Sequence, residues 1–353
     1  MNALAHIIEA RSQDGHDLVP HHLVADLHAP RPLVYWFDLL SSASIGWAAF
    51  AAAIMAPSLW WAAAAVVVSA LALYRAVCFT HEITHLRRRA VPGFETVWNL
   101  LLGVPLLLPS FTYVGVHQSH HGLSTYGTKD DPEYLPFRRS RRLILAFSIQ
   151  SSFVLPLLLA LRFLVLAPVG LVWPAFHRWL EAHASSFAMN PAYRRVVTPA
   201  QARTMRLWEA VTLACWAAVA WTLAAGLLPL RTLLVWYVVM AFVSFVNTMR
   251  VLGAHEYETD GTPRDREAQL SDSIDTPGGP WTELWAPVGL RYHALHHYFP
   301  GIPYHNLGRA YRRIVQVSPK ADEYRASTSP SLRHSLSTLY RRALRGASAL
   351  VRW

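Results

Sequence analysis

The chain has 353 residues, of which 53% are hydrophobic and only 15% charged, and its mean hydropathy is +0.22. This composition is too apolar for an ordinary soluble domain and indicates an integral membrane protein. The net charge of +10 comes mainly from arginine. Because the arginines gather beside apolar segments, membrane topology and lipid headgroups explain them better than nucleic-acid binding does.

Four apolar segments are expected to cross the membrane as two helical hairpins. A helix needs about 20 residues to cross the hydrocarbon core. Segments of about this length lie at 34–56, 59–79, 207–227 and 232–252. Residues 1–31 precede them and contain no continuous apolar run, so we expect an N-terminal cytoplasmic segment and no cleaved signal peptide.

Two further apolar stretches, 97–116 and 143–173, are interrupted by proline and by glycine or arginine. Each fits a true span, a re-entrant hairpin or a helix at the interface. The predicted fold is therefore an all-α integral membrane protein with four spans and additional re-entrant or interfacial helices. Its basic loops, at 85–90, 137–142 and 308–313, should face the cytoplasm by the positive-inside rule.

The chain is expected to form one domain over residues 1–353, with its core at 32–313 and a basic tail at 314–353. In that tail, leucines recur near helical spacing opposite arginines, at Leu332, Leu336, Leu339 and Leu344. The pattern predicts an amphipathic helix that lies on the membrane surface.

Directly after the second predicted span, residues 81–85 read HEITH, the HExxH pattern of zinc metalloproteases. In such enzymes two histidines one helical turn apart hold zinc, and the glutamate activates water. A protease would also need a third ligand from a later segment. If the protease hypothesis is wrong, Glu82 is expected to be a carboxylate that supports a ligand or a solvated turn residue.

Two HxxHH motifs follow and favour a different metal site. They comprise His117, His120 and His121, and His293, His296 and His297. Residues i, i+3 and i+4 share one helix face, so each motif is expected to present three imidazoles to one point.

With His81 and His85 these motifs supply eight ligands, and His255, just beyond the last span, is a ninth candidate. One ion cannot use so many nitrogen atoms, whereas two ions with four or five each can, and would keep positions open for oxygen.

Neither the protease nor a non-enzymatic haem or metal carrier explains both HxxHH motifs. His305 is left open, and the remaining histidines lack the clustering. The spacing therefore predicts a cytoplasmic helical region that caps the spans and holds a histidine-rich site for two metal ions. Aromatic residues near the motifs are candidates to line an apolar substrate tunnel: Phe111, Tyr113, Trp281, Trp285, Tyr298 and Phe299.

Over residues 32–313 the chain resembles the membrane fatty acid desaturase superfamily, of bacterial type. The resemblance is carried by the three histidine boxes in family order and by the stretch LRYHALHHYFPGIPYHNLGRAY. It implies an oxidoreductase with a non-haem di-iron centre, O₂ as co-substrate and an acyl chain as substrate. A hydroxylase or ketolase of the same superfamily is the alternative.

The resemblance also implies an acyl-chain lipid or acyl thioester substrate and a separate electron donor, such as a ferredoxin, rubredoxin or cytochrome b5-like carrier. The implied location is a bacterial inner membrane, with the histidine boxes on the cytoplasmic side. His255 resembles the family's extra histidine. Related enzymes place an asparagine four residues before it, but position 251 is Val here. Asn247 is therefore only a candidate for a water-mediated ligand.

Overall fold

The computed structural model describes residues 19–318 and 320–345. These residues form helices, turns and isolated β-bridges, without a β-strand among them. The all-α prediction is therefore confirmed over the described ranges. Most of the predicted N-terminal segment lies outside them. Its described end folds into two short 3₁₀ turns, η1 (His21–Leu23) and η2 (Ala25–Leu27).

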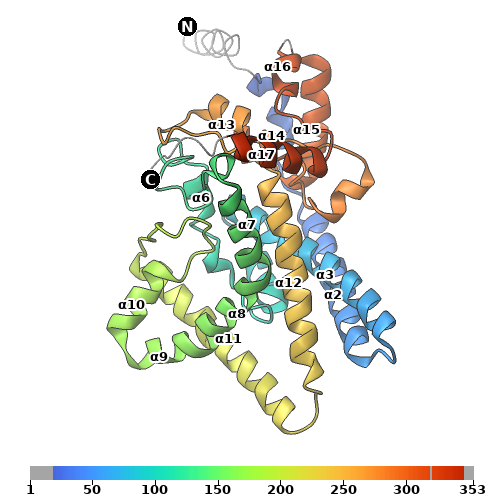
Figure 1. Cartoon of the computed structure of the whole chain (residues 1–353), viewed down its shortest axis with the longest axis vertical. Helices are drawn as coiled ribbons and strands as arrows, with labels where there is room; N and C mark the ends of the chain where they lie inside the picture. The colour runs from blue at the N-terminus through green and yellow to red at the C-terminus, as the bar shows by residue number, and fades with distance from the viewer. Residues whose placement is uncertain (1–18, 319, 346–353) are drawn as a thin grey trace.

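The first hairpin consists of α2 (Pro32–Met55) and α3 (Leu59–Val77), which lie side by side (Figure 1). Gly46 permits their close approach, since a Cβ atom there would lie 2.6 Å from Leu73 Cδ2. A short α4 (Phe79–His85) continues α3 and carries the HEITH residues. The span predicted at 59–79 thus leads directly into the first histidine pair.

The second hairpin consists of α11 (Pro199–Ala224) and α12 (Arg231–Leu252). Thr198 and Gln201 form a capping box at the start of α11. In their most apolar windows, 56% of α12 is buried but only 17% of α11. Because α12 packs against α2, α3 and α8, it is the central helix and α11 is peripheral.

Between the hairpins, residues 141–172 form one bent helical segment in the order α7 (Arg141–Ile149), η6 (Gln150–Val154), α8 (Leu155–Ala160), η7 (Leu161–Leu166) and α9 (Ala167–Val172). Both η6 and η7 are π-helical turns. They precede Pro156 and Pro168, which cannot donate the backbone hydrogen bond of a regular helix. In Figure 1 the chain descends through α7 and α8 and returns through α10 (Pro174–His183).

Five helical segments are long and apolar enough to cross a membrane, by length and composition. They include the four predicted spans and residues 141–172. The prediction of four spans left open whether residues 143–173 cross the membrane, re-enter it or lie at its interface, and this segment is long and apolar enough to cross.

The stretch 97–116 is not among these candidate spans. It contains the end of α5 (Phe94–Trp98), the π-turn η3 (Asn99–Gly103) and the 3₁₀ turn η4 (Ser110–Thr112). The Asn99 side chain donates to Ser110 Oγ and accepts from its backbone N–H, both at 2.7 Å. Such pairing allows an irregular backbone to be buried inside the protein.

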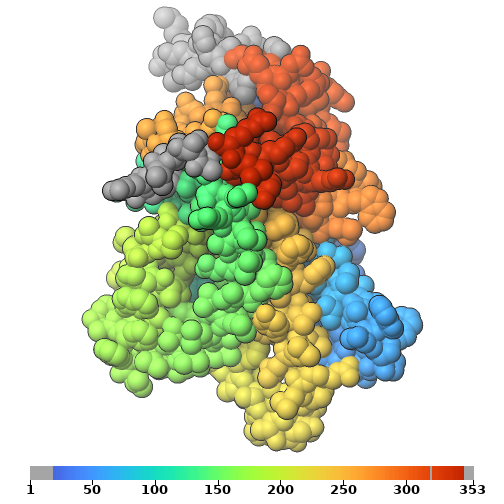
Figure 2. Space-filling view, in the orientation of Figure 1, coloured from blue at the N-terminus to red at the C-terminus, as the bar shows by residue number. Residues whose placement is uncertain are grey.

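A helical region lies beyond the end of α12 (Figure 1). It comprises α13 (Arg266–Asp272), η8 (Pro280–Leu284), α14 (His293–Tyr298), α15 (Tyr304–Val317), α16 (Ala321–Arg325) and α17 (Leu332–Arg345). The predicted tail helix is α17. Its buried Leu339 and Ala343 face the protein, and it packs on α7, α12 and η5 (Phe137–Arg139), as Figure 2 shows for α7 and α12. The leucine face of α17 thus packs partly against the protein itself, whereas the prediction assigned it to the membrane surface.

Candidate metal centre

The nine histidines predicted as ligands converge into two groups. In each group, ring nitrogen atoms from all members lie within 4.8 Å of one another. The first group holds five histidines, namely His81, His85, His117, His121 and His296. The second group holds four, namely His120, His255, His293 and His297. The arrangement matches the expectation of two ions with four or five nitrogen atoms each.

The expectation that each HxxHH motif presents three imidazoles to one point is wrong. His117 and His121 lie in the first group and His120 in the second, while His293 and His297 lie in the second and His296 in the first. At 3.6 residues per turn, residues i and i+4 differ by only about 40° around the helix, but i+3 and i+4 differ by about 100°. Each motif therefore straddles the two groups.

The Nε2 atoms point toward one another within each group. In the first, His121 Nε2 lies 3.0 Å from His117 Nε2, and His296 Nε2 lies 3.1 Å from His85 Nε2. In the second, His293 Nε2 lies 2.9 Å from His255 Nε2 and 3.2 Å from His297 Nε2. Two nitrogen atoms bound to one ion at about 2.1 Å lie about 3.0 Å apart when they subtend a right angle. The spacing fits shared coordination.

Five of these rings strongly favour the uncharged form that a metal ligand needs. Burial lowers the pKa far below the usual histidine value because a charged ring would lose its hydration, and neighbouring rings add to the effect. This holds for His121, His255, His293, His296 and His297. Burial also disfavours charge on His120, but the Asp131 carboxylate outweighs it and leaves that pKa raised.

A carboxylate orients His117 in the first group. Glu133 Oε1 lies 2.8 Å from His117 Nδ1, and the Tyr113 hydroxyl lies 2.9 Å from the same nitrogen. Tyr113 also donates to the other oxygen of Glu133, at 3.1 Å. Because the carboxylate accepts, Nδ1 carries the proton and the Nε2 lone pair is free for a metal ion.

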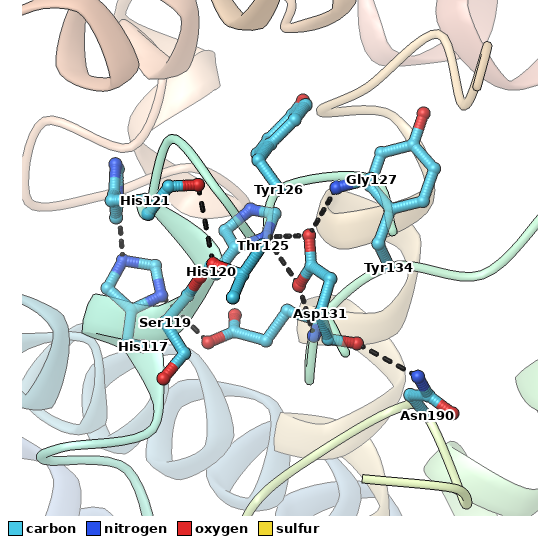
Figure 3. Close-up of polar contacts among 12 residues, drawn as sticks. His117, Ser119, His120, His121, Thr125, Tyr126, Gly127, Asp131, Tyr134 and Asn190 are labelled. Carbon is cyan, nitrogen blue, oxygen red and sulfur yellow. Dashed lines mark hydrogen bonds and ion pairs between the residues drawn. The ribbon is translucent and has the colours of Figure 1, made fainter. Parts of the chain in front are cut away.

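His120 has the same arrangement in the second group. Both oxygen atoms of Asp131 lie 3.0 Å from His120 Nδ1. The carboxylate also accepts backbone N–H bonds from Gly127 and Glu133, each at 2.8 Å. Figure 3 shows Asp131 between the His120 ring and Gly127. The loop that follows the second histidine box thus supplies a carboxylate to each group.

A tyrosine and an aspartate support His255. The Tyr126 hydroxyl lies 3.0 Å from His255 Nδ1 and donates to Asp272 Oδ2 at 2.8 Å. Tyr134 donates to the same oxygen at 2.8 Å. These buried contacts connect three parts of the chain that are distant in sequence. They are the loop after the second histidine box, the segment that follows α12, and helix α13.

Sequence reasoning missed these supporting residues. A signal for two of them was present, because the acidic stretch DDPEY at 130–134 follows the second box closely. Ligating histidines usually donate their outer N–H to a carboxylate or carbonyl. No comparable signal marked Tyr126 or Asp272, because Tyr126 meets Asp272 and His255 only in the folded chain.

His81 gives a direct test of whether the site suits a metal. The residue is buried, and within the described part of the chain neither of its ring nitrogen atoms has a hydrogen-bond partner. An unpaired buried polar atom is costly, and a metal ion would satisfy the nitrogen that faces its group. The neutral rings, the fixed tautomers and this unpaired histidine together fit metal binding.

Three other residues have different surroundings. Glu82 is buried, not solvated, and accepts from the Tyr35 hydroxyl at 2.6 Å and from Tyr304 N–H at 3.1 Å. His305 accepts from the backbone N–H of Arg31 and belongs to neither histidine group. The Asn247 side-chain oxygen accepts from Arg250 at 3.1 Å, and its water-mediated role stays a prediction.

A cavity of about 350 Å³ begins beside the first group. His81, Tyr113 and Glu133 line it, and most of the other lining side chains are apolar, including Leu143, Phe147, Leu155 and Leu158. Leu158 is 42% exposed, so the cavity reaches the outer surface of the bent segment 141–172. Of the six aromatic residues proposed for a tunnel, Tyr113 is among the lining residues.

Comparison with known proteins decides the family. The sequence model of the fatty acid desaturase family matches residues 58–329. The chain belongs to this family. It is also 39% identical over 321 residues to a ceramide hydroxylase of Caulobacter vibrioides (strain NA1000 / CB15N), a match that covers 91% of this chain and 92% of that protein.

Family and relative together indicate an oxidoreductase, and the five apolar helices indicate an integral membrane protein. The family is a di-iron family that acts on lipids, and the two histidine groups could bind metal. HEITH is thereby interpreted as the first histidine box and not as a protease motif. The hydroxylase alternative fits the relative about as well as the predicted desaturase does.

Proposed function

We propose that the protein is an O₂-dependent lipid hydroxylase that oxidises an unactivated C–H bond of a ceramide-type lipid at a centre of two iron ions. The observation that carries the proposal is the separation of nine histidines into two groups at the end of a largely apolar cavity. The choice of hydroxylation and of a ceramide-type substrate rests on the hydroxylase relative.

The histidines of each group would hold one ion, with all nine as ligands and Asn247 as a candidate to bind through water. The chemistry supplied by the bound iron is reduction of O₂ and oxidation of the C–H bond. Glu133 and Asp131 hold the outer protons of His117 and His120. They thereby fix these rings with Nε2 toward the metal.

The cavity would hold the lipid chain beside the first group. An inert methylene has no polar group that the enzyme can bind, so its reaction depends on rigid positioning and exclusion of water. The apolar side chains that line the cavity suit both tasks. Because the cavity reaches the surface of segment 141–172, a lipid would enter from the membrane.

Hydroxylation would place one oxygen atom of O₂ on the carbon and release the other as water. It would consume two electrons and two protons. The electrons would come from a separate carrier, such as a ferredoxin, rubredoxin or cytochrome b5-like protein. We infer that this carrier docks on the cytoplasmic side of a bacterial inner membrane, where the positive-inside rule places the basic loops.

Desaturation is the second candidate, because the family model is that of fatty acid desaturases. It would use the same electrons and protons but release both oxygen atoms as water and leave a carbon–carbon double bond. The substrate would then be an acyl-chain lipid or acyl thioester.

The first test is the metal content of detergent-purified protein expressed in iron-replete medium. Two irons per chain are expected, and His120→Ala should lose the iron of the second group. One zinc per chain that is unaffected by His120→Ala but lost in His85→Ala would overturn the proposal. It would support the interpretation of HEITH as a zinc metalloprotease motif.

The second test is product analysis by mass spectrometry in a host that makes ceramides. A product heavier by one oxygen atom supports hydroxylation, whereas a product lighter by two hydrogen atoms supports desaturation. Neither product should form with His296→Ala. Unchanged lipids from iron-loaded protein that is supplied with a reductant and carrier would contradict both candidates.

A further inference from the structure

Arg250 near the end of α12 is buried, and not all of its hydrogen-bond donors have a partner. It is 9% exposed, it donates to Asn247 Oδ1 at 3.1 Å, and its side chain also has a hydrogen-bond interaction with the Tyr74 hydroxyl. Its Nε atom has no hydrogen-bond partner within the described residues. Its closest electrostatic neighbours are the uncharged side chains Tyr74, Tyr113 and Cys78. A buried guanidinium in such surroundings is costly.

Two other buried arginines in this protein have partners for their guanidinium donors. Arg162 pairs with the Glu209 carboxylate. Arg195 donates to the backbone carbonyls of Phe111, Val114 and Ser185. Among the described residues Arg250 forms no salt bridge with a carboxylate and its Nε has no partner, so that donor is available to a ligand.

That donor lies at the histidine end of the cavity. Arg250 and Asn247 both line the cavity, together with His81, Tyr113 and Glu133. Tyr113 interacts electrostatically with Arg250 and stacks on His117 with ring centroids 4.8 Å apart. Hydroxyl groups of Thr80 and Ser186 in the same lining lack hydrogen-bond partners within the described ranges. The polar wall is therefore next to the proposed metal centre, and the apolar walls lie farther along.

We propose that Arg250 binds an acceptor oxygen of the lipid head group, so that the enzyme oxidises a carbon close to that head group instead of a mid-chain methylene. The inference rests on the proposed function. With the oxygen at Arg250, the adjacent carbons lie beside the first histidine group and the chain extends along Leu143, Phe147 and Leu155. A substrate with its head group outside the cavity would leave Arg250 Nε without a partner.

The shared chemistry is an oxygen acceptor, which an amide carbonyl or hydroxyl of a ceramide and the ester of a phospholipid can both supply. We would load iron-replete full-length protein with a ceramide or with a phosphatidylethanolamine that bears the same acyl chain. Binding would be measured in detergent micelles, and the oxidised carbon would be located by fragmentation mass spectrometry. Stronger binding of the ceramide would identify the amide and hydroxyl groups as the source.

Arg250→Met should weaken binding of the preferred lipid about tenfold or more, because it removes a charged hydrogen-bond donor. Arg250→Lys should restore part of it. Iron content should stay at the wild-type value in both. Arg231→Met, at the opposite end of the same helix, serves as the matched control and should bind the lipid like wild type.

Three results would overturn the proposal. They are a mid-chain oxidised carbon in the wild type, equal lipid binding by Arg250→Met and wild type, or loss of iron in Arg250→Met, which would make Arg250 a support for the metal centre. Because binding is measured without turnover, failure of the proposed hydroxylation would not obscure the role of Arg250.

Discussion

Asp131 holds the His120 ring with both carboxylate oxygen atoms 3.0 Å from Nδ1, and is itself held by two backbone N–H groups. Backbone N–H groups of the loop after the second histidine box therefore hold the carboxylate in place. The carboxylate in turn orients the His120 ring. Partners of this kind are expected to matter nearly as much as the ligands themselves.

Asp131→Asn should reduce iron affinity about 10- to 100-fold, because the amide loses the charge that favours the His120 tautomer. The measurement is iron retained during titration with a chelator. Asp130→Asn is the matched control, since Asp130 is the exposed neighbour of the buried Asp131. Equal retention by the two variants would contradict the assigned role of Asp131.

Leu339→Ala in α17 should destabilise the protein by about 2–5 kcal/mol, because it empties a buried site. Leu339 packs in a cluster with Tyr126 and Tyr257, so the tail helix supports residues next to His255. Thermal unfolding in detergent measures the effect. Leu344→Ala, at an exposed position of the same helix, should change stability by no more than about 0.5 kcal/mol. If both variants unfold like wild type, α17 does not pack as described.

Arg162→Leu should destabilise by about 3–5 kcal/mol, because Glu209 would lose its buried cation. Glu209 would keep its contact with His177 Nε2, which lies 2.9 Å away. The double variant Arg162→Leu, Glu209→Leu should lose less than the sum of the two single variants. Thermal unfolding again measures the change, with the exposed Arg203→Leu as control. Strict additivity would show that the pair is not coupled.

Stability should fall as pH rises from about 4 to about 7, through Asp275, because burial raises the pKa of this carboxyl to about 7. Over that interval the folded protein keeps a proton that the unfolded chain has released, so rising pH favours unfolding. Asp275 accepts from the N–H groups of Ala294 and Leu295 at 2.8 and 3.2 Å, which an asparagine oxygen can also do.

Asp275→Asn should therefore fold and show a smaller slope of melting temperature against pH between 5 and about 7. The comparison with wild type under identical detergent conditions isolates this group from other titrating residues. An unchanged slope would mean that Asp275 is not protonated in the folded protein at these pH values.

The sequence was sufficient to predict the all-α membrane class, both hairpins and the convergence of nine histidines. These features follow from local regularities, since apolar length defines a span and helical spacing defines a face. The division of each HxxHH motif between two groups was not predicted. The angle of about 100° between residues i+3 and i+4 allows the division, but which histidine joins which group depends on how α6 (His117–His120) and α14 are oriented relative to α4.

The hydrogen bonds that support the histidines could not be predicted from the sequence either. Tyr126 and Asp272 meet beside His255 although Tyr126 is 146 positions from Asp272 in the chain. The role of segment 141–172 was left open for a related reason. Its prolines predicted interruptions, but the packing of η7 against α11 through the buried contact between Arg162 and Glu209 was not visible in the sequence.

Both histidine groups draw on the third box, which begins at His293, after the last candidate span ends at Leu252. Neither group is complete while the carboxyl-terminal part of the chain is still being synthesised. A complete set of nitrogen ligands for either group therefore forms only after every candidate span has been synthesised. A chain that stops before this box would contain every candidate span but leave His81, His117 and His120 without His293, His296 and His297.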